Sequence, residues 1–167
     1  DIRTGGPKLG TEREQLDAWL AEYRQALLLK IDGLTPVQLA ARSVPPSALS
    51  LLGIVRHLAE VEEYWLREVL HGIEVPLRWS SQEEPDGDID GARASTAADD
   101  VQTYLRVIAT TAADAARWED LDIPVTGLRH GQELNLRWIL THLIEEYARH
   151  LGHADLLREA IDGSTGY

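Results

Sequence analysis

The sequence predicts an all-α protein, an up-down-type four-helix bundle with a short extra helix and a long polar loop between the second and third long helices. Four long segments carry apolar residues at the helical period, and no segment alternates as a strand does. A chain of 167 residues is long enough for one hydrophobic core. We therefore expect a flexible segment at 1–10, one domain at 11–163 and a tail at 164–167.

The first long helix is expected to open at Thr11, with Glu14 completing a capping box. Gly33 is a typical stop signal, and Thr35-Pro36 then predicts the short extra helix. The apolar face of the first helix consists of Leu16, Trp19, Leu20, Tyr23, Leu27 and Ile31.

The second long helix is expected from about Ser47, after Pro45-Pro46, to His71. Its apolar face consists of Leu51, Ile54, Leu58, Val61 and Trp65. Residues 76–94 are polar, contain proline and glycine, and show no periodicity. We expect them to form a loop.

The third helix is predicted from near Ser95, and residues 123–134 are expected to be irregular or hairpin-like. Its apolar positions are Val101, Tyr104, Leu105, Ile108, Ala112 and Ala115. The fourth helix is expected from about Asn135 to Asp162, with Gly163 as its C-terminal stop. One face of it contains Ile139, Leu143, Tyr147, His150, Ala154, Leu157 and Ile161.

Charge and composition exclude several classes of function. The formal net charge of −12 leaves no basic surface for nucleic acid. No apolar run is long enough to span a bilayer, and no signal peptide is visible, so we expect a cytoplasmic protein without a membrane partner. The chain has no cysteine, so any thiol chemistry must use an external thiol.

Glu146 and His150 are the main functional signal. Four residues apart on one helix, they share a face that is otherwise apolar, where an unpaired carboxylate and imidazole are costly to bury. His57 borders the apolar face of the second helix and offers a third ligand for a divalent metal. Zinc suits two imidazoles and one carboxylate, and nickel, cobalt or iron(II) would accept the same donors.

Other interpretations of these residues stay open. Glu146 and His150 also fit a surface ion pair, and His57 fits a hydrogen-bonded core histidine. An alternative metal site on one helix would use His142, Glu146 and His150, but three side chains from two turns of one helix converge poorly on one ion. His142 otherwise makes a hydrogen bond on the helix face, and His153 is expected to support a ligand or face the substrate.

Two further patterns favour structural roles. Asp86 to Gly91 reproduces half of a calcium-loop signature, but Ala97 stands where a bidentate Glu is required, so an acidic solvated loop is expected. Trp65, Trp138 and Tyr147 lie at helical spacing and are predicted to be core residues.

Residues 47–62, containing Arg56-His57-Leu58-Ala59-Glu60, resemble the second helix of the DinB/YfiT-like superfamily, and residues 136–155 resemble its fourth. The resemblance implies a four-helix bundle, often dimeric, with one histidine ligand from the second helix and two ligands from the fourth. Many members have His-x-x-x-His followed by Gly-Gln. Here Glu146 stands at the first position and His153 replaces the glutamine. This resembles the His-Glu-His set of mycothiol-dependent maleylpyruvate isomerase, which supports His57, Glu146 and His150. Most of the chain resembles an actinobacterial branch of the superfamily that is similar to this isomerase and to mycothiol S-transferases.

The resemblance implies an enzyme that transfers mycothiol, or a related thiol, to an electrophile, or an isomerase that adds and removes the thiol. Arg149, Arg56 and His153 are candidates for contacting the substrate. The alternative is a non-catalytic metal-binding dimer of the DinB stress-response type, in which His153 or Glu60 would close the metal site. DNA binding, suggested only by the superfamily name, conflicts with the negative charge. We expect a homodimer.

Overall fold

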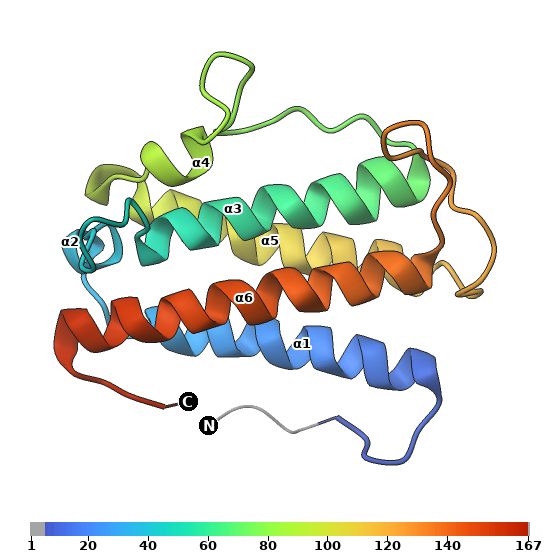
Figure 1. Cartoon of the computed structure of the whole chain (residues 1–167), viewed down its shortest axis with the longest axis horizontal. Coiled ribbons are helices and arrows are strands. Elements are labelled where there is room, and N and C mark those ends of the chain that lie inside the picture. Colours follow the sequence, from blue (N-terminus) through green and yellow to red (C-terminus); the bar gives the residue numbers. More distant parts are fainter. Residues whose placement is uncertain (1–5, 167) are drawn as a thin grey trace.

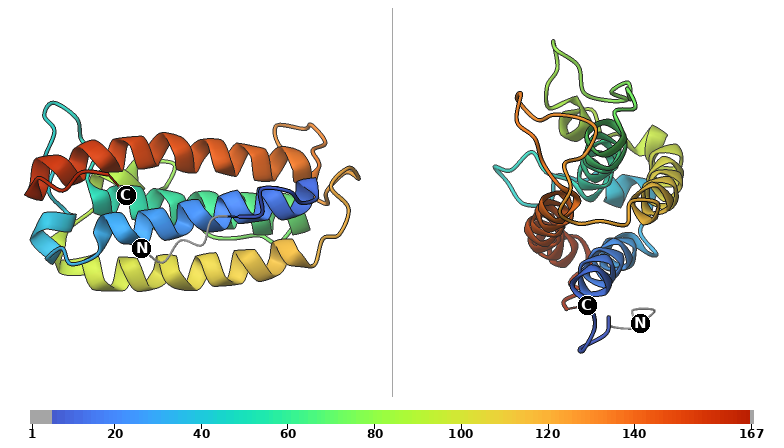
Figure 2. Two further views of the ribbon diagram at one scale, coloured as in Figure 1. Left: turned by 90° about the horizontal axis from the view of Figure 1, so that it is seen from below. Right: turned by 90° about the vertical axis from the view of Figure 1, so that its right-hand side faces the viewer.

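The computed structural model describes residues 6–166, and in these residues the protein is all-α, as the sequence predicts. Four long helical segments lie side by side (Figures 1 and 2). They are α1 (Glu12–Ile31), α3 (Leu51–Glu63) continued by the π-helical η1 (Tyr64–Val69), α5 (Ala97–Ala116) and α6 (Leu136–Asp162). Short helices α2 (Pro36–Leu39), α4 (Gly87–Asp90) and η2 (Ala94–Thr96) lie in the connections. Part of the predicted N-terminal segment, residues 1–5, and Tyr167 of the predicted tail lie outside the described residues.

The ends of α1, α2 and α6 agree with the sequence prediction. Thr11 and Thr35 each form a capping box, and Asn135 caps α6 by accepting from the Trp138 backbone N–H. Gly163 ends α6 in the left-handed conformation, with φ of 77°. One residue predicted on the apolar face of α1 was wrong, because Trp19 is exposed, with its ring tilted against that of Tyr23.

The second long helix begins later than predicted. Ser50 caps α3 by accepting from the Gly53 backbone N–H, and Ser47 belongs to the preceding turn. The hydrophobic pattern does continue to His71, but residues Tyr64–Val69 adopt π-helical geometry. Such segments are rare and frequently lie at functional sites.

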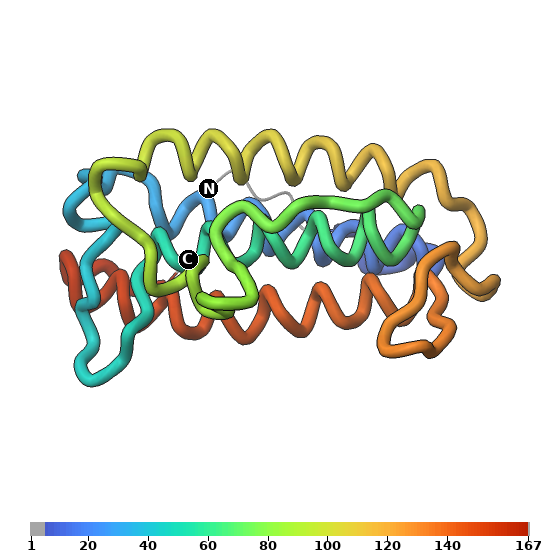
Figure 3. The backbone as a smooth tube through the Cα atoms, turned by 90° about the horizontal axis from the view of Figure 1, so that it is seen from above, coloured from blue at the N-terminus to red at the C-terminus, as the bar shows by residue number. Residues whose placement is uncertain are grey.

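The segment that follows η1 returns along α3, as Figures 1 and 3 show. The predicted solvated loop is wrong here, because the segment contains α4 and buries Gly87 and Asp88. A Cβ on Gly87 would lie 2.3 Å from the Trp79 carbonyl oxygen, and one on Gly53 would lie 3.2 Å from the Ile89 backbone. Two glycines therefore allow α4 to approach α3 closely.

Residues 123–134 form the predicted hairpin-like connection, with isolated bridges between Pro124 and Asn135 and between Arg129 and Gln132. The connection docks on η1, because the Gly127 N–H donates to the Val69 carbonyl over 2.8 Å. A Cβ on Gly127 would lie 2.6 Å from that carbonyl oxygen, so only glycine fits without a shift.

A charged network is buried in the core between the long helices. Glu62 of α3 is fully buried and receives two hydrogen bonds from Arg24 of α1, at 2.7 and 2.6 Å. The Thr111 and Tyr147 hydroxyls donate to the same carboxylate. Burial and the Glu62 charge raise the pKa of Tyr147, so its hydroxyl keeps its proton and remains a donor. The described helices include none long and apolar enough to cross a membrane.

Candidate metal site

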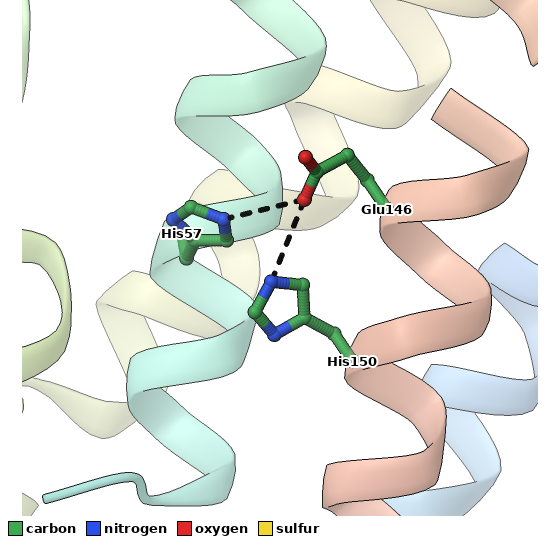
Figure 4. A group of neighbouring side chains, drawn as sticks. All are labelled: His57, Glu146 and His150. Carbon is green, nitrogen blue, oxygen red and sulfur yellow. Dashed lines mark ion pairs between the residues drawn. The ribbon is translucent and has the colours of Figure 1, made fainter. Parts of the chain in front are cut away.

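Two adjacent helices bring the three predicted ligands together. His57 comes from the middle of α3, and Glu146 and His150 come from successive turns of α6 (Figure 4). One donor atom from each residue lies within 4.8 Å of the other two. The His57 and His150 rings are tilted against each other with their centroids 4.7 Å apart.

The distances between these donors fit a metal site better than a set of hydrogen bonds. His57 Nε2 and His150 Nε2 lie 3.9 and 3.5 Å from the same atom, Glu146 Oε2. An N–H···O hydrogen bond usually measures about 2.7–3.2 Å. Ligands about 2.1 Å from a tetrahedral zinc lie roughly 3.4 Å from one another. The observed spacing is close to the second value.

Asp88 orients His57, and the sequence reasoning missed it. Its Oδ2 lies 2.7 Å from His57 Nδ1, and its Oδ1 accepts from the Ile89 backbone N–H at 2.9 Å. With Nδ1 engaged by the carboxylate, Nε2 is the imidazole nitrogen directed to Glu146. A carboxylate behind a histidine ligand fixes the ring and makes it a stronger donor. Asp88 is the second residue of the single-turn helix α4, and nothing in the sequence around it signals a pairing with His57.

The two histidines have opposite pKa shifts. Burial lowers the pKa of His57, but the hydrogen bond and charge of Asp88, with the charges of Glu146 and Glu60, outweigh burial and raise it. Burial, followed by the neighbouring His57 and His153, lowers the pKa of His150 to about 4. His150 is therefore neutral at physiological pH, the state in which imidazole binds a metal.

A second group of possible ligands lies on α6 alone. It consists of His142, Glu145 and Glu146, and His142 Nε2 lies 3.5 Å from the other Glu146 oxygen, Oε1. The predicted one-helix set of His142, Glu146 and His150 does not form a single group among the described residues. The second group is the poorer candidate, because Glu145 is half exposed and paired with the Arg149 cation.

Arg56 and Glu60, predicted near the site, hold the returning segment instead. Arg56 is buried, donates to the Gly87 carbonyl over 2.8 Å, and lies 5.1 Å from the Trp79 ring centroid. Glu60 accepts from the backbone N–H groups of residues 78–80 and from the Ser80 hydroxyl. Neither side chain belongs to a group of possible ligands in the described residues, and four hydrogen bonds hold the Glu60 carboxylate on the returning segment.

Arg149 and His153 differ in their relation to the site. The Arg149 side chain is exposed and bonded to Glu145. The His153 ring makes an edge contact with His150, with centroids 5.4 Å apart, and none of residues 6–166 forms a hydrogen bond with its buried Nδ1. His153 therefore adjoins the ligand set, as expected, and no group of possible ligands in the described residues includes it.

The acidic loop residues do not form the alternative calcium site. Asp88 is directed to His57, whereas Asp90 pairs with Arg42 on the surface. No group of possible ligands within the described range draws on Asp86, Asp88 and Asp90. The expected solvation of Asp88 was wrong, because its side chain is buried against His57.

The predicted aromatic core residues divide into two kinds. Trp65 and Tyr147 are buried, as predicted. Trp138 is 44% exposed, so its assignment to the core was wrong. Its ring stacks on His142, one turn before Glu146, so the exposed tryptophan lies beside the candidate site.

The fold and this geometry define an all-α protein with a candidate metal centre of two imidazoles and one carboxylate between two long helices. A family model described as mycothiol-S-transferase matches residues 15–163. The chain belongs to the mycothiol S-transferase family. A comparison with curated proteins gives no match.

Proposed function

We propose that this protein is a metal-dependent thiol transferase that joins mycothiol to an electrophilic small molecule. His57, Glu146 and His150 would hold a divalent ion, and zinc suits these donors best. The family supports mycothiol as the thiol. The absence of cysteine is consistent with a reaction whose sulfur comes from a cosubstrate.

One observation carries the proposal: two imidazole nitrogens from different helices converge on one carboxylate oxygen, at 3.9 and 3.5 Å. Three protein ligands are typical of catalytic zinc sites, whereas structural sites have four. Among the described residues, the two candidates for a fourth ligand do not join the group. Glu60 binds the returning segment, and the His153 ring makes an edge contact with the His150 ring. This favours a catalytic site over a closed structural one.

Each residue of the site has a separate task. Asp88 holds the His57 ring so that Nε2 is available, and His150 stays neutral because burial lowers its pKa. Glu146 supplies the negative charge that two neutral imidazoles lack. A divalent ion bound there would lower the pKa of a thiol and so provide a thiolate at neutral pH.

Metal analysis of variants distinguishes the two groups of donors. We expect His57→Ala and His150→Ala to lose the bound metal of protein purified without chelator, and His142→Ala and Glu145→Ala to keep it. The second pair is the matched control, because those residues make up the one-helix alternative. Metal retained in the first pair would refute the ligand set.

An activity assay then separates an enzyme from a non-catalytic metal protein. Zinc-loaded protein should accelerate the reaction of mycothiol with a generic electrophile such as chlorodinitrobenzene, and chelation should abolish the acceleration. Retained metal without any thiol transfer across several electrophiles would favour the non-catalytic alternative.

We also propose that the four long helices form the DinB/YfiT type of four-helix bundle, as one domain over residues 11–163. A cytoplasmic homodimer that contacts neither nucleic acid nor membrane remains a prediction. Sedimentation of the purified protein tests the dimer.

A further inference from the structure

A cluster of aromatic rings adjoins the candidate metal site at the end of α6 that faces the hairpin-like connection. We call Trp65, Trp138 and His142 the aromatic shelf. The Trp138 and His142 rings are stacked, with centroids 5.0 Å apart and planes at 21°, and the Trp65 ring lies 5.2 and 4.8 Å from them. Trp65 is buried, the His142 side chain is 26% exposed and Trp138 is 44% exposed. The shelf therefore presents mainly the Trp138 ring to solvent.

A cation borders the shelf. The Arg129 guanidinium lies 5.2 Å from the Tyr64 ring centroid and 5.7 Å from that of Trp65, and it donates to the Tyr64 hydroxyl over 3.1 Å. Arg129 belongs to the connection that docks on η1 through Gly127. The π-helical η1 supplies both Tyr64 and Trp65. The irregular helix and the docked connection thus place polar donors at the edge of an aromatic surface.

The shelf is continuous with the proposed metal ligands. His142 Nε2 lies 3.5 Å from Glu146 Oε1, whereas the other oxygen of the same carboxylate faces His57 and His150. Trp138 precedes Glu146 by eight residues, about 12 Å along a helix axis. A ligand that reacts at the metal site and extends along α6 by that distance would reach Trp138.

The chemistry of the shelf suits a sugar. One face of a sugar ring exposes C–H groups that pack on an aromatic ring, and its edge carries hydroxyls that accept from guanidinium and imidazole N–H groups. A neutral polyol also escapes the repulsion that a chain with a net charge of −12 exerts on anions. Mycothiol has this composition, because its N-acetylcysteine is joined to a glucosaminyl-inositol unit.

We propose that the aromatic shelf is a carbohydrate subsite that binds the glucosaminyl-inositol part of mycothiol, with Trp138 as its main contact. This assignment rests on the proposed function for the identity of the thiol. The subsite would let the protein distinguish mycothiol from small thiols that lack the sugar.

The test is calorimetric titration of the full chain, loaded with zinc, with thiol-free N-acetylglucosaminyl-inositol in the millimolar range, because the amide keeps the amino sugar neutral as it is in mycothiol. We expect saturable binding that Trp138→Ala weakens roughly three- to tenfold. Trp19→Ala is the matched control, because Trp19 is similarly exposed but lies on α1, and it should bind as the wild type does. Circular dichroism and metal content establish that the variants are folded and loaded.

The outcomes separate this inference from the proposed function. Wild-type protein that transfers mycothiol but does not bind the sugar, or Trp138→Ala protein that binds it normally, would overturn the subsite and leave the transferase intact. Sugar binding that persists in His57→Ala protein, which has lost its metal, would support the subsite independently. A Trp138→Ala effect confined to the KM of the electrophile would assign the shelf to the other substrate and refute the proposal.

Discussion

Asp88 and His57 are 31 residues apart in the sequence, yet Asp88 Oδ2 lies 2.7 Å from His57 Nδ1. Asp88 is buried on α4, the single helical turn of the returning segment that packs against α3. The carboxylate both raises the pKa of His57 and fixes which nitrogen of the ring is directed to Glu146. The candidate site thus depends on a segment with no apolar periodicity of its own.

Replacing Asp88 should weaken metal binding without removing a proposed ligand. In Asp88→Asn, His57 loses the charge that orients it and strengthens it as a donor, so zinc affinity should fall about 10- to 100-fold. Competition with a chromophoric chelator measures this change. Asp90→Asn is the control, because Asp90 lies on the same turn but pairs with Arg42 at the surface. Equal zinc affinity in Asp88→Asn and wild type would contradict the role of Asp88.

The close approach of α4 should make Gly87 intolerant of a side chain. In Gly87→Ala, the new Cβ would lie 2.3 Å from the Trp79 carbonyl oxygen and force the backbone apart. We expect a loss of about 1–3 kcal/mol in the free energy of unfolding, together with weaker zinc binding. Urea denaturation and the chelator assay measure the two effects.

Gly152→Ala provides the contrast, because no heavy atom lies within 4 Å of the Cβ it would add inside α6. Because glycine is less favourable than alanine inside a helix, this substitution should stabilise the protein by up to about 1 kcal/mol. A Gly87→Ala protein as stable as the wild type would show that α4 moves freely.

The buried carboxylate of Glu62 should be essential for stability. Glu62→Ala leaves the Arg24 guanidinium in the core without its two hydrogen bonds, which should cost about 3–5 kcal/mol. Denaturant unfolding measures the loss, and the double variant Arg24→Leu with Glu62→Leu should recover much of it. Glu145→Ala, which removes an exposed pair, should change stability by less than about 1 kcal/mol. If Glu62→Ala and Glu145→Ala lost equal amounts of stability, burial would not be the cause of the Glu62 effect.

The metal-free protein should lose stability in acid because of His150. Its pKa of about 4 in the folded state lies below the ordinary value of about 6.5, so the unfolded chain binds a proton first as the pH falls. Stability should decrease between about pH 6.5 and 4 by roughly 1–3 kcal/mol, and His150→Gln should flatten this profile. Urea unfolding in the presence of chelator at several pH values measures it.

His57 should act in the opposite direction. Its raised pKa contributes stability that is complete below the unfolded pKa and is lost as the pH rises through the folded one. Asp88→Asn should reduce this loss of stability on the alkaline side.

On the acid side, a His150→Gln protein whose stability falls with pH as that of the wild type does would assign the acid sensitivity to a group other than His150.

The long helices could be predicted from the sequence, as could the proximity of His57, Glu146 and His150. The capping box at Thr11 and the proline after Thr35 act within a few residues, and the Glu146–His150 spacing fixes both side chains on one helix face. His57 borders the apolar face of its helix, and the family resemblance supported its pairing with the other two.

The features that could not be predicted depend on tertiary contacts between distant segments. Asp88 reaches His57 because two glycines allow the backbones to touch, and neither glycine specifies its partner in the sequence. Trp138 has the spacing of a core residue, but its ring is 44% exposed and stacks on His142 beside Trp65 of the π-helical η1. Helical period alone does not reveal how completely a neighbouring helix covers each residue of an apolar face.

The proposed ligands come from distant parts of the chain, since His57 lies in its first half and His150 near its end. An ion bound by both would act as a cross-link that closes a loop of more than half the chain. Such closure restricts the unfolded ensemble, and binding that requires the assembled site adds its free energy to folding. Cellular metal supply would then set how long the folded protein survives, as well as how much of it is active.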